Sequence, residues 1–260
     1  MKSRVRVRRE RPTALAWALA LAITMLMVYI ATLPAAQQRV VADIPASARV
    51  TKELTFESVE GWCVALGRGA DAVQARLLAA GAAVEGCAVC VVELEGATRV
   101  LSGLCASRRE AQRLANALSE RGFDAEPISL IADTLHLRVT APEAQIGAIA
   151  DAEATLRIQT RQTGEIARQL EQGEIGTDAA RTLFALAASE TAACAERLNA
   201  YPASAKNDLC AALIAQLKAL SERANTLADS ASGSVALAGM ARCAQLQGFV
   251  AYWEMRRGMG

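Results

Sequence analysis

The chain has 260 residues, and its 28 basic and 27 acidic residues leave a formal net charge of +1. Six of the cations lie within the first eleven residues, so the rest of the chain carries 22 cations against 26 acids. A mildly acidic remainder without a basic block argues against nucleic acid as a partner. The single histidine, His136, cannot assemble the common histidine-containing metal sites or a Ser–His hydrolase site. We therefore expect no catalytic residues, no metal and no cofactor.

The N-terminus predicts a membrane anchor. Residues 1–12 form a basic tail, and residues 14–33 form an uncharged apolar run, ALAWALALAITMLMVYIATL. About 20 apolar residues in an α-helix span the roughly 30 Å hydrocarbon core of a bilayer. We predict a single transmembrane helix over residues 13–34 in the lipid bilayer of the cell membrane, with the basic tail in the cytoplasm and the rest outside. A cleaved secretory signal is the alternative, although its apolar region is usually only about 7–15 residues long.

Beyond the apolar run, a change of hydrophobic period divides the chain. Residues 35–53 show no sustained period and contain a proline, so they are predicted to be a linker. Residues 54–140 mix short strand-like runs with two helices, whereas residues 141–260 are helical to the end. The sequence therefore predicts a small α+β domain followed by a helical bundle.

The α+β region repeats one order of elements. Each half reads strand, glycine, helix, glycine, strand, and Glu95-Gly96 between the halves favours a tight hairpin turn. The order β-α-β-β-α-β places both helices on one face of a sheet. The predicted strands are 62–66, 88–94, 98–102 and 125–131, the helices are 70–80 and 108–121, and the glycines are Gly67, Gly81, Gly103 and Gly122.

The helix over residues 108–121 has the clearest local signals. Ser107 and Glu110 form an S-x-x-E capping box, in which each side chain accepts a hydrogen bond from an otherwise unpaired backbone N–H. Gly122 ends the helix, where a left-handed conformation costs glycine least. The apolar stripe predicted to face the sheet consists of Ala111, Leu114, Ala115 and Leu118.

Two segments of this region follow the pattern of a known family. VLSGLCASRREAQRLANALSERGFDAEPISL runs from a strand and a glycine through a Ser-capped helix to Gly-Phe and a final strand, and WCVALGRG has the pattern of a first strand. Over about residues 55–131 the chain therefore resembles the SPOR (sporulation-related repeat) domain family. The matching positions are Trp62, Val64, Gly67, Arg99, Val100, Gly103, Ala106, Ser107, Ala111, Leu114, Leu118, Gly122 and Phe123.

The resemblance implies binding of peptidoglycan, notably glycan strands stripped of peptide stems, at division or sporulation sites of the cell envelope. It implies a ligand surface on the open face of the sheet, where strand alternation leaves Cys63, Ala65, Arg99 and Leu101. The candidate ligand-binding residues are Trp62, Ala65, Arg99 and Leu101. Because this face is small and largely apolar, the alternative is a membrane-anchored scaffold that binds envelope proteins and whose SPOR-like fold has lost glycan binding.

The region after Pro142 carries four helical segments separated by short breaks, which favours an antiparallel bundle. Its first helix is predicted to be about 30 residues long and to project beyond the others. Near the C-terminus, Phe249, Tyr252 and Trp253 share one helical face. They are predicted to pack in the core, with a partner-binding patch as the alternative.

Two pairs of cysteines are candidates for chemistry. Cys194 and Cys210 lie almost symmetrically about Pro202, so a hairpin of two helices can bring them together as a disulfide or as adjacent buried thiols. Cys87 and Cys90 form a C-x-x-C that enters a predicted strand, where alternation sends the two sulfurs to opposite faces. We interpret this pair as core packing, with a disulfide or metal role as the alternative.

Overall fold

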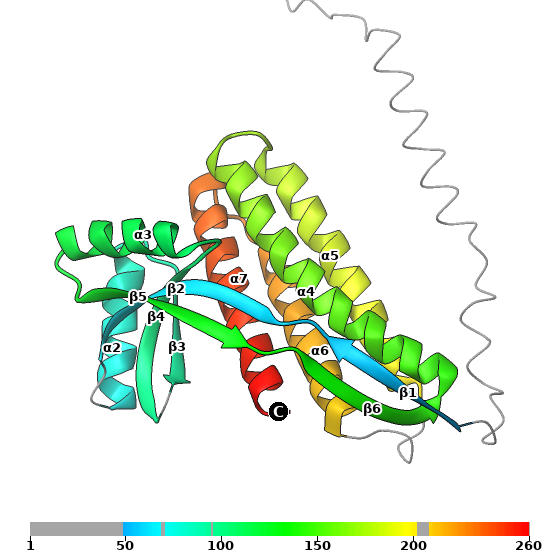
Figure 1. Cartoon of the computed structure of the whole chain (residues 1–260). Helices are drawn as coiled ribbons and strands as arrows, with labels where there is room; N and C mark the ends of the chain where they lie inside the picture. Colours follow the sequence, from blue (N-terminus) through cyan, green and yellow to red (C-terminus); the bar gives the residue numbers. More distant parts are fainter. Residues whose placement is uncertain (1–48, 69–70, 95, 202–207, 260) are drawn as a thin grey trace, which may run out of the picture. The chain divides into compact units, whose positions relative to one another are not determined.

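The computed structural model describes residues 49–68, 71–94, 96–201 and 208–259, which form six strands and six helices (Figure 1). The predicted basic tail and transmembrane segment, residues 1–34, lie outside these residues. No helix in the described part of the chain is both long enough and apolar enough to cross a membrane. The strands form two sheets rather than one. The predicted fold class, which included a transmembrane helix and a single sheet, is thus corrected to an α+β fold with two sheets.

A long antiparallel ribbon connects the two sheets. β1 pairs with β6, and directly after them β2 pairs with β5, so the same two stretches of chain run side by side from end to end (Figure 1). Residues 49–53, which were expected to be linker, form the start of this ribbon. The bounds are Arg49–Phe56 for β1, Val59–Arg68 for β2, Ala125–Ala132 for β5 and Leu135–Pro142 for β6.

The larger sheet has the strand order β3-β4-β2-β5 and is antiparallel throughout. Its elements follow the predicted order β-α-β-β-α-β as β2-α2-β3-β4-α3-β5. The helix expected to end at Gly81 continues to Val84, and Gly86 takes the left-handed conformation instead, with φ +80°. The remaining bounds are Ala72–Val84 for α2, Val89–Leu94 for β3, Ala97–Cys105 for β4 and Arg108–Glu120 for α3.

The predicted capping box is present at the start of α3. Ser107 Oγ accepts a hydrogen bond from the Glu110 backbone N–H at 3.3 Å, and Glu110 Oε2 accepts one from the Ala106 backbone N–H at 3.0 Å. Leu114 differs from the prediction because its side chain is only partly buried, lying over Gly103. The fully buried residues of α3 are Ala111, Ala115 and Leu118.

Four helices form the bundle, and each packs against its neighbours in the chain while the first also packs against the last. The first helix has 29 residues, close to the expected length, but it does not project. Its C-terminal half packs with α5 and α7 around Phe184 in a core of its own. The helices are α4 (Glu143–Glu171), α5 (Thr177–Asn199), α6 (Asp208–Ala228) and α7 (Ser234–Arg257).

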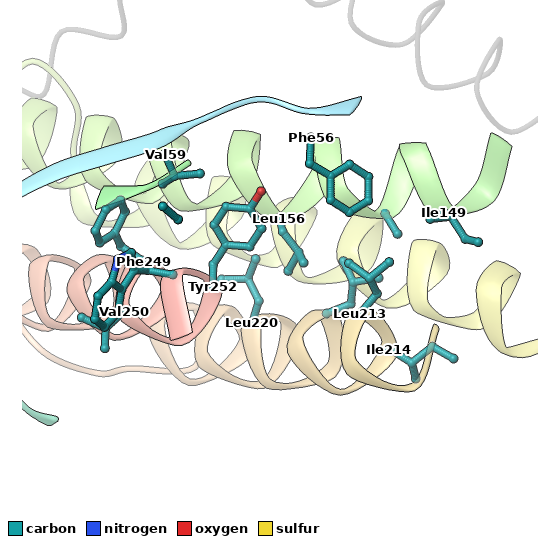
Figure 2. Close-up of a cluster of buried hydrophobic side chains, with 14 of the residues drawn as sticks. Phe56, Val59, Ile149, Leu156, Leu213, Ile214, Leu220, Phe249, Val250 and Tyr252 are labelled. Carbon is teal, nitrogen blue, oxygen red and sulfur yellow. The ribbon is translucent and has the colours of Figure 1, made fainter. Parts of the chain in front are cut away.

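The sheet and the bundle share one hydrophobic core. Leu101 and Leu130 of the sheet, Phe56 of the ribbon and Leu156 of α4 belong to the same cluster of buried side chains as Leu213 of α6. Figure 2 shows side chains of this cluster converging from the ribbon and the helices. Residues on both sides of the predicted boundary near Thr140 are therefore joined by packing, and residues 46–260 form one compact unit.

Candidate functional site: the covered sheet face and the adjoining groove

The two faces of the central strands have the orientation that alternation predicts. Val64 and Val100 pack against α2 and α3 in one core. Cys63, Ala65 and Leu101 point to the opposite face and belong to the core shared with the bundle. The face on which a SPOR-like domain is expected to hold its ligand is therefore an internal surface of this protein.

Helix α7 covers this face. Its residues Phe249, Val250 and Trp253 lie in the same core as the three sheet residues just named. Two polar contacts also join α7 to the sheet: Trp253 Nε1 donates to the Ile131 carbonyl at 3.0 Å, and Cys243 Sγ donates to the Val89 carbonyl at 3.4 Å. The C-terminal aromatic residues Phe249, Tyr252 and Trp253 thus pack in the core, and they cover this face of the sheet.

The four candidate ligand-binding residues do not meet on one exposed surface. Ala65 and Leu101 are 1% and 0% exposed beneath the bundle. Arg99 lies on the same face, and its guanidinium is paired with Glu126 at 3.1 Å with 18% of its side chain exposed. Trp62 lies on the other face, where its ring is stacked below the Arg108 guanidinium, 6.0 Å away, and its Nε1 donates to Glu60 Oε1.

No disulfide joins the cysteines of the described residues. Cys194 is a free, buried thiol, and Cys210 lies 3.8 Å from Gln145 Nε2 in the same core, so the candidate disulfide is not formed. Cys87 and Cys90 pack in different cores on opposite faces of the sheet, as alternation predicts. Burial raises the pKa of Cys63 to about 12 and that of Cys90 to about 11, which suppresses the nucleophilic thiolate. Among the described residues, no cluster of side chains is suited to a metal ion.

His136 belongs to the ribbon and not to a site. It lies on β6 opposite Thr55 of β1, and its Nδ1 is 3.2 Å from the Thr55 hydroxyl. The side chain is exposed, as expected for the outward position of a short strand.

A buried arginine that the sequence did not single out joins the ribbon to the bundle. Arg256 of α7 is 3% exposed and donates to the carbonyls of Phe56 and Asp133, one on each strand of the ribbon where it bends. It also donates to the Tyr252 hydroxyl, which in turn donates to the buried carboxylate of Glu153 on α4. A basic residue in the last turn of a helix is common, so only the tertiary structure distinguishes this one from Arg257 beside it.

A groove of about 960 Å³ lies beside the covered face. One wall consists of α4 from Arg157 to Glu171 and of α7 from Gly239 to Tyr252. The opposite wall consists of Ser58 and the first residues of β2 (59–61), the end of β4, the loop at residues 86–88 and the inner side of α3. This volume is in the range of small-molecule and cofactor sites in proteins, about 300–1,000 Å³.

The groove is lined by guanidinium groups and carboxylates, and most are paired with one another. Arg168 contacts Glu165 and Glu174, and Arg242 makes two hydrogen bonds to Glu171, at 3.0 and 2.8 Å. The hydrogen bond from Arg168 lowers the pKa of Glu165, which keeps that carboxylate charged. The groove is thus a charged surface at neutral pH.

Arg161 and the side-chain oxygen of Gln245, which both belong to groove-lining residues, have no protein partner among the described residues. Arg161 makes no ion pair or hydrogen bond with another side chain in the described part of the chain. Gln245 lies flat against Gly164, where an added Cβ would come within 2.1 Å of Gln245 Nε2, and its Oε1 is buried without a hydrogen-bond donor among the described residues. Arg161 is exposed to water, so of these two groups only the buried Gln245 oxygen is left unsatisfied.

Comparison of the chain with protein-family models, with curated proteins and with solved structures finds no match. The similarity to SPOR domains therefore remains a resemblance in the sequence motifs.

Proposed function

We propose that this protein is a non-enzymatic interaction protein, in which a SPOR-like sheet serves as an internal platform for the protein's own helical bundle and the exposed surfaces bind a protein partner. This proposal takes the place of glycan binding through the sheet face, which the resemblance to SPOR domains implied. The proposed location outside the cytoplasm depends on residues 1–34, which lie outside the described residues, and it stays a prediction.

The observation that carries the proposal is the packing of α7 against the sheet face. Ala65 and Leu101, two of the candidate glycan contacts, are buried together with Phe249 and Trp253. Separating these surfaces would expose apolar area at a cost of about 25 cal/mol per Å², so opening the face is unfavourable unless a ligand replaces the lost contacts. A sugar polymer, which is bound mainly through hydroxyl groups, offers little to replace these apolar contacts.

Co-sedimentation with cell-wall sacculi tests the proposal. The purified full-length chain, kept in mild detergent, is mixed with intact sacculi and with sacculi whose peptide stems have been removed by an amidase. We expect the chain to remain in the supernatant in both cases, while a SPOR domain with an exposed sheet face sediments with the amidase-treated sacculi as the positive control. Saturable sedimentation of the chain with either preparation would overturn the proposal.

Photo-crosslinking in the native host gives the complementary test. A photoreactive amino acid replaces Ser58, an exposed residue of the groove lining, or, as the matched control, Ser189 on the exposed side of α5. We expect a discrete protein adduct from the groove position that survives digestion of the cell wall with a muramidase. An adduct that disappears on muramidase digestion would instead assign the exposed surface to the cell wall.

A further inference from the structure

One edge of β2 is open where the strand enters the groove. β2 pairs with β5 along Val59–Leu66, but its pairing with β4 begins only at Trp62. No strand of the described part of the chain pairs with residues 59–61 on the β4 side. Successive residues of an antiparallel strand direct their backbone groups to alternate edges, so at least one of these three presents its N–H and C=O on the open edge. The same residues line the groove, so this edge borders a space that another strand can enter.

The length of the groove suits an extended chain. Its α4 wall runs from Arg157 to Glu171, and the fourteen steps between these residues, at 1.5 Å each, correspond to about 21 Å. An extended peptide rises about 3.3 Å per residue, so about six residues fill this length. The volume of about 960 Å³ is also sufficient for side chains on such a segment.

The two walls of the groove differ in chemistry. The α4 wall presents Arg157, Arg161 and Arg168, of which Arg161 has no acidic partner within the described residues. The α4 wall also carries the carboxylates of Glu165 and Glu171, which pair with Arg168 and Arg242. The opposite wall presents the apolar side chains of Leu104, at the end of β4, and Leu114 of α3, together with the charged residues Glu60, Glu110 and Arg121. A strand added beside β2 alternates its side chains between these two walls. Acidic residues on one side and apolar residues on the other complement both.

We propose that the groove binds an extended segment of a partner protein, in which acidic and apolar residues alternate and which pairs with the open edge of β2 as an added strand. Main-chain hydrogen bonds then supply affinity, and the alternating side chains supply specificity. The inference rests on the proposed interaction function and names the class of partner for this site. A short acidic ligand such as phosphate would satisfy Arg161 alone, without using the open edge or the apolar wall.

Binding of a designed peptide tests the proposal. The probe is a fluorescein-labelled peptide of about six alternating valine and aspartate residues, titrated by fluorescence anisotropy with the full-length chain. We expect saturable binding that Arg161→Glu weakens at least about tenfold, because the variant replaces attraction by repulsion. Arg76→Glu changes the net charge equally on exposed α2, outside the groove, and should leave the dissociation constant within about twofold.

A second pair of variants tests whether filling the groove blocks peptide binding. Gly239 of α7 lines the groove, and an added Cβ there meets no atom within 4 Å, so Gly239→Leu adds a bulky side chain at the groove without a clash at its Cβ. Gly147 of α4 is also exposed and equally open but does not line the groove. We expect Gly239→Leu to weaken peptide binding at least about tenfold and Gly147→Leu to leave it unchanged.

N-methylation of the peptide tests pairing with the strand edge. In two isomeric peptides, alternate backbone nitrogens are methylated, so that only one isomer loses the N–H groups directed at β2. We expect one isomer to bind at least about tenfold more weakly than the other. Equal binding of both isomers, equal binding of a valine–lysine peptide, or complete displacement by inorganic phosphate would each overturn the proposal. If the peptide fails to bind and sacculi also fail to sediment the chain, this inference falls while the proposed interaction function stands.

Discussion

Phe249 occupies the space that a side chain at Gly61 would need. A Cβ on Gly61 would lie 2.3 Å from Phe249 Cζ and 2.9 Å from Leu104 Cδ1, well inside van der Waals contact. The absence of a side chain on β2 is therefore what allows α7 to approach the sheet this closely. The close packing of α7 on the sheet, on which the proposed function rests, therefore depends on the pair Gly61 and Phe249.

We predict that Gly61→Ala lowers the free energy of unfolding by about 1–3 kcal/mol, because the new methyl group displaces a well-packed ring. Phe249→Ala alone should cost about 3–5 kcal/mol through the cavity it leaves. In the double variant the methyl group occupies part of that cavity, so the combined cost should be smaller than the sum of the two. Urea denaturation of the four proteins measures this coupling.

The matched control for this cycle is Gly239→Ala. Its Cβ meets no atom within 4 Å, and alanine is favoured over glycine in a helix by about 1 kcal/mol, so the variant should be slightly stabilised. Strict additivity of Gly61→Ala and Phe249→Ala would show that the ring does not lie over the glycine in solution.

Removing the buried guanidinium should be more costly than removing its exposed neighbour. Arg256→Met leaves the buried carboxylate of Glu153 without one of its cations and three ribbon carbonyls without their donor. We expect a loss of about 3–5 kcal/mol in the free energy of unfolding. Arg257→Met, at an exposed position over the Trp253 ring, should cost less than about 1 kcal/mol. Similar unfolding midpoints for the two variants would contradict the role assigned to Arg256.

The buried thiol of Cys63 should make stability depend on pH in the alkaline range. Burial raises its pKa from 9.0 to about 12, so between these values the unfolded state binds fewer protons than the folded state. The free energy of unfolding therefore falls as pH rises, and the stability that the neutral thiol contributes is fully present only below about pH 9.

Comparison with Cys63→Ala isolates this thiol from other groups that titrate above pH 9. We expect the stability difference between the wild-type chain and the variant to shrink by about 2–3 kcal/mol between pH 8 and pH 11. Denaturant titrations at both pH values measure it. A difference that does not change with pH would place the thiol in contact with water.

The α3 helix offers a ranking of three substitutions. Ser107→Ala should cost about 1 kcal/mol through the lost cap. Leu118→Ala should cost about 2–5 kcal/mol because Leu118 is fully buried, and Leu114→Ala should cost less than Leu118→Ala because Leu114 is only partly buried. Thermal or urea unfolding of the three variants gives the order. A larger loss for Leu114→Ala than for Leu118→Ala would mean that α3 is rotated relative to the sheet.

The elements predicted correctly are those that short-range patterns specify. The capping box at Ser107, the glycines at Gly103 and Gly122 and the alternation in β2 and β4 act within a few residues, so each can be read without knowing what lies across the fold. The ribbon strand β1 was not predicted because its partner, β6, is some 80 residues away in the chain. No turn joins the two strands directly, so the local sequence carries no signal of the pairing.

The sequence by itself determined the composition of the decisive surface, since Cys63, Ala65 and Leu101 made the sheet face small and apolar. Only the tertiary structure decided that α7 occupies this face, that Gly61 admits Phe249 and that Arg256 joins the ribbon to the bundle. The physical reason is that the hydrophobic effect is non-directional. An apolar face must be covered by apolar groups, but its sequence does not specify which element of the chain supplies them. That choice is made by packing between side chains almost 200 residues apart in the chain, where shape and not local pattern selects the contact.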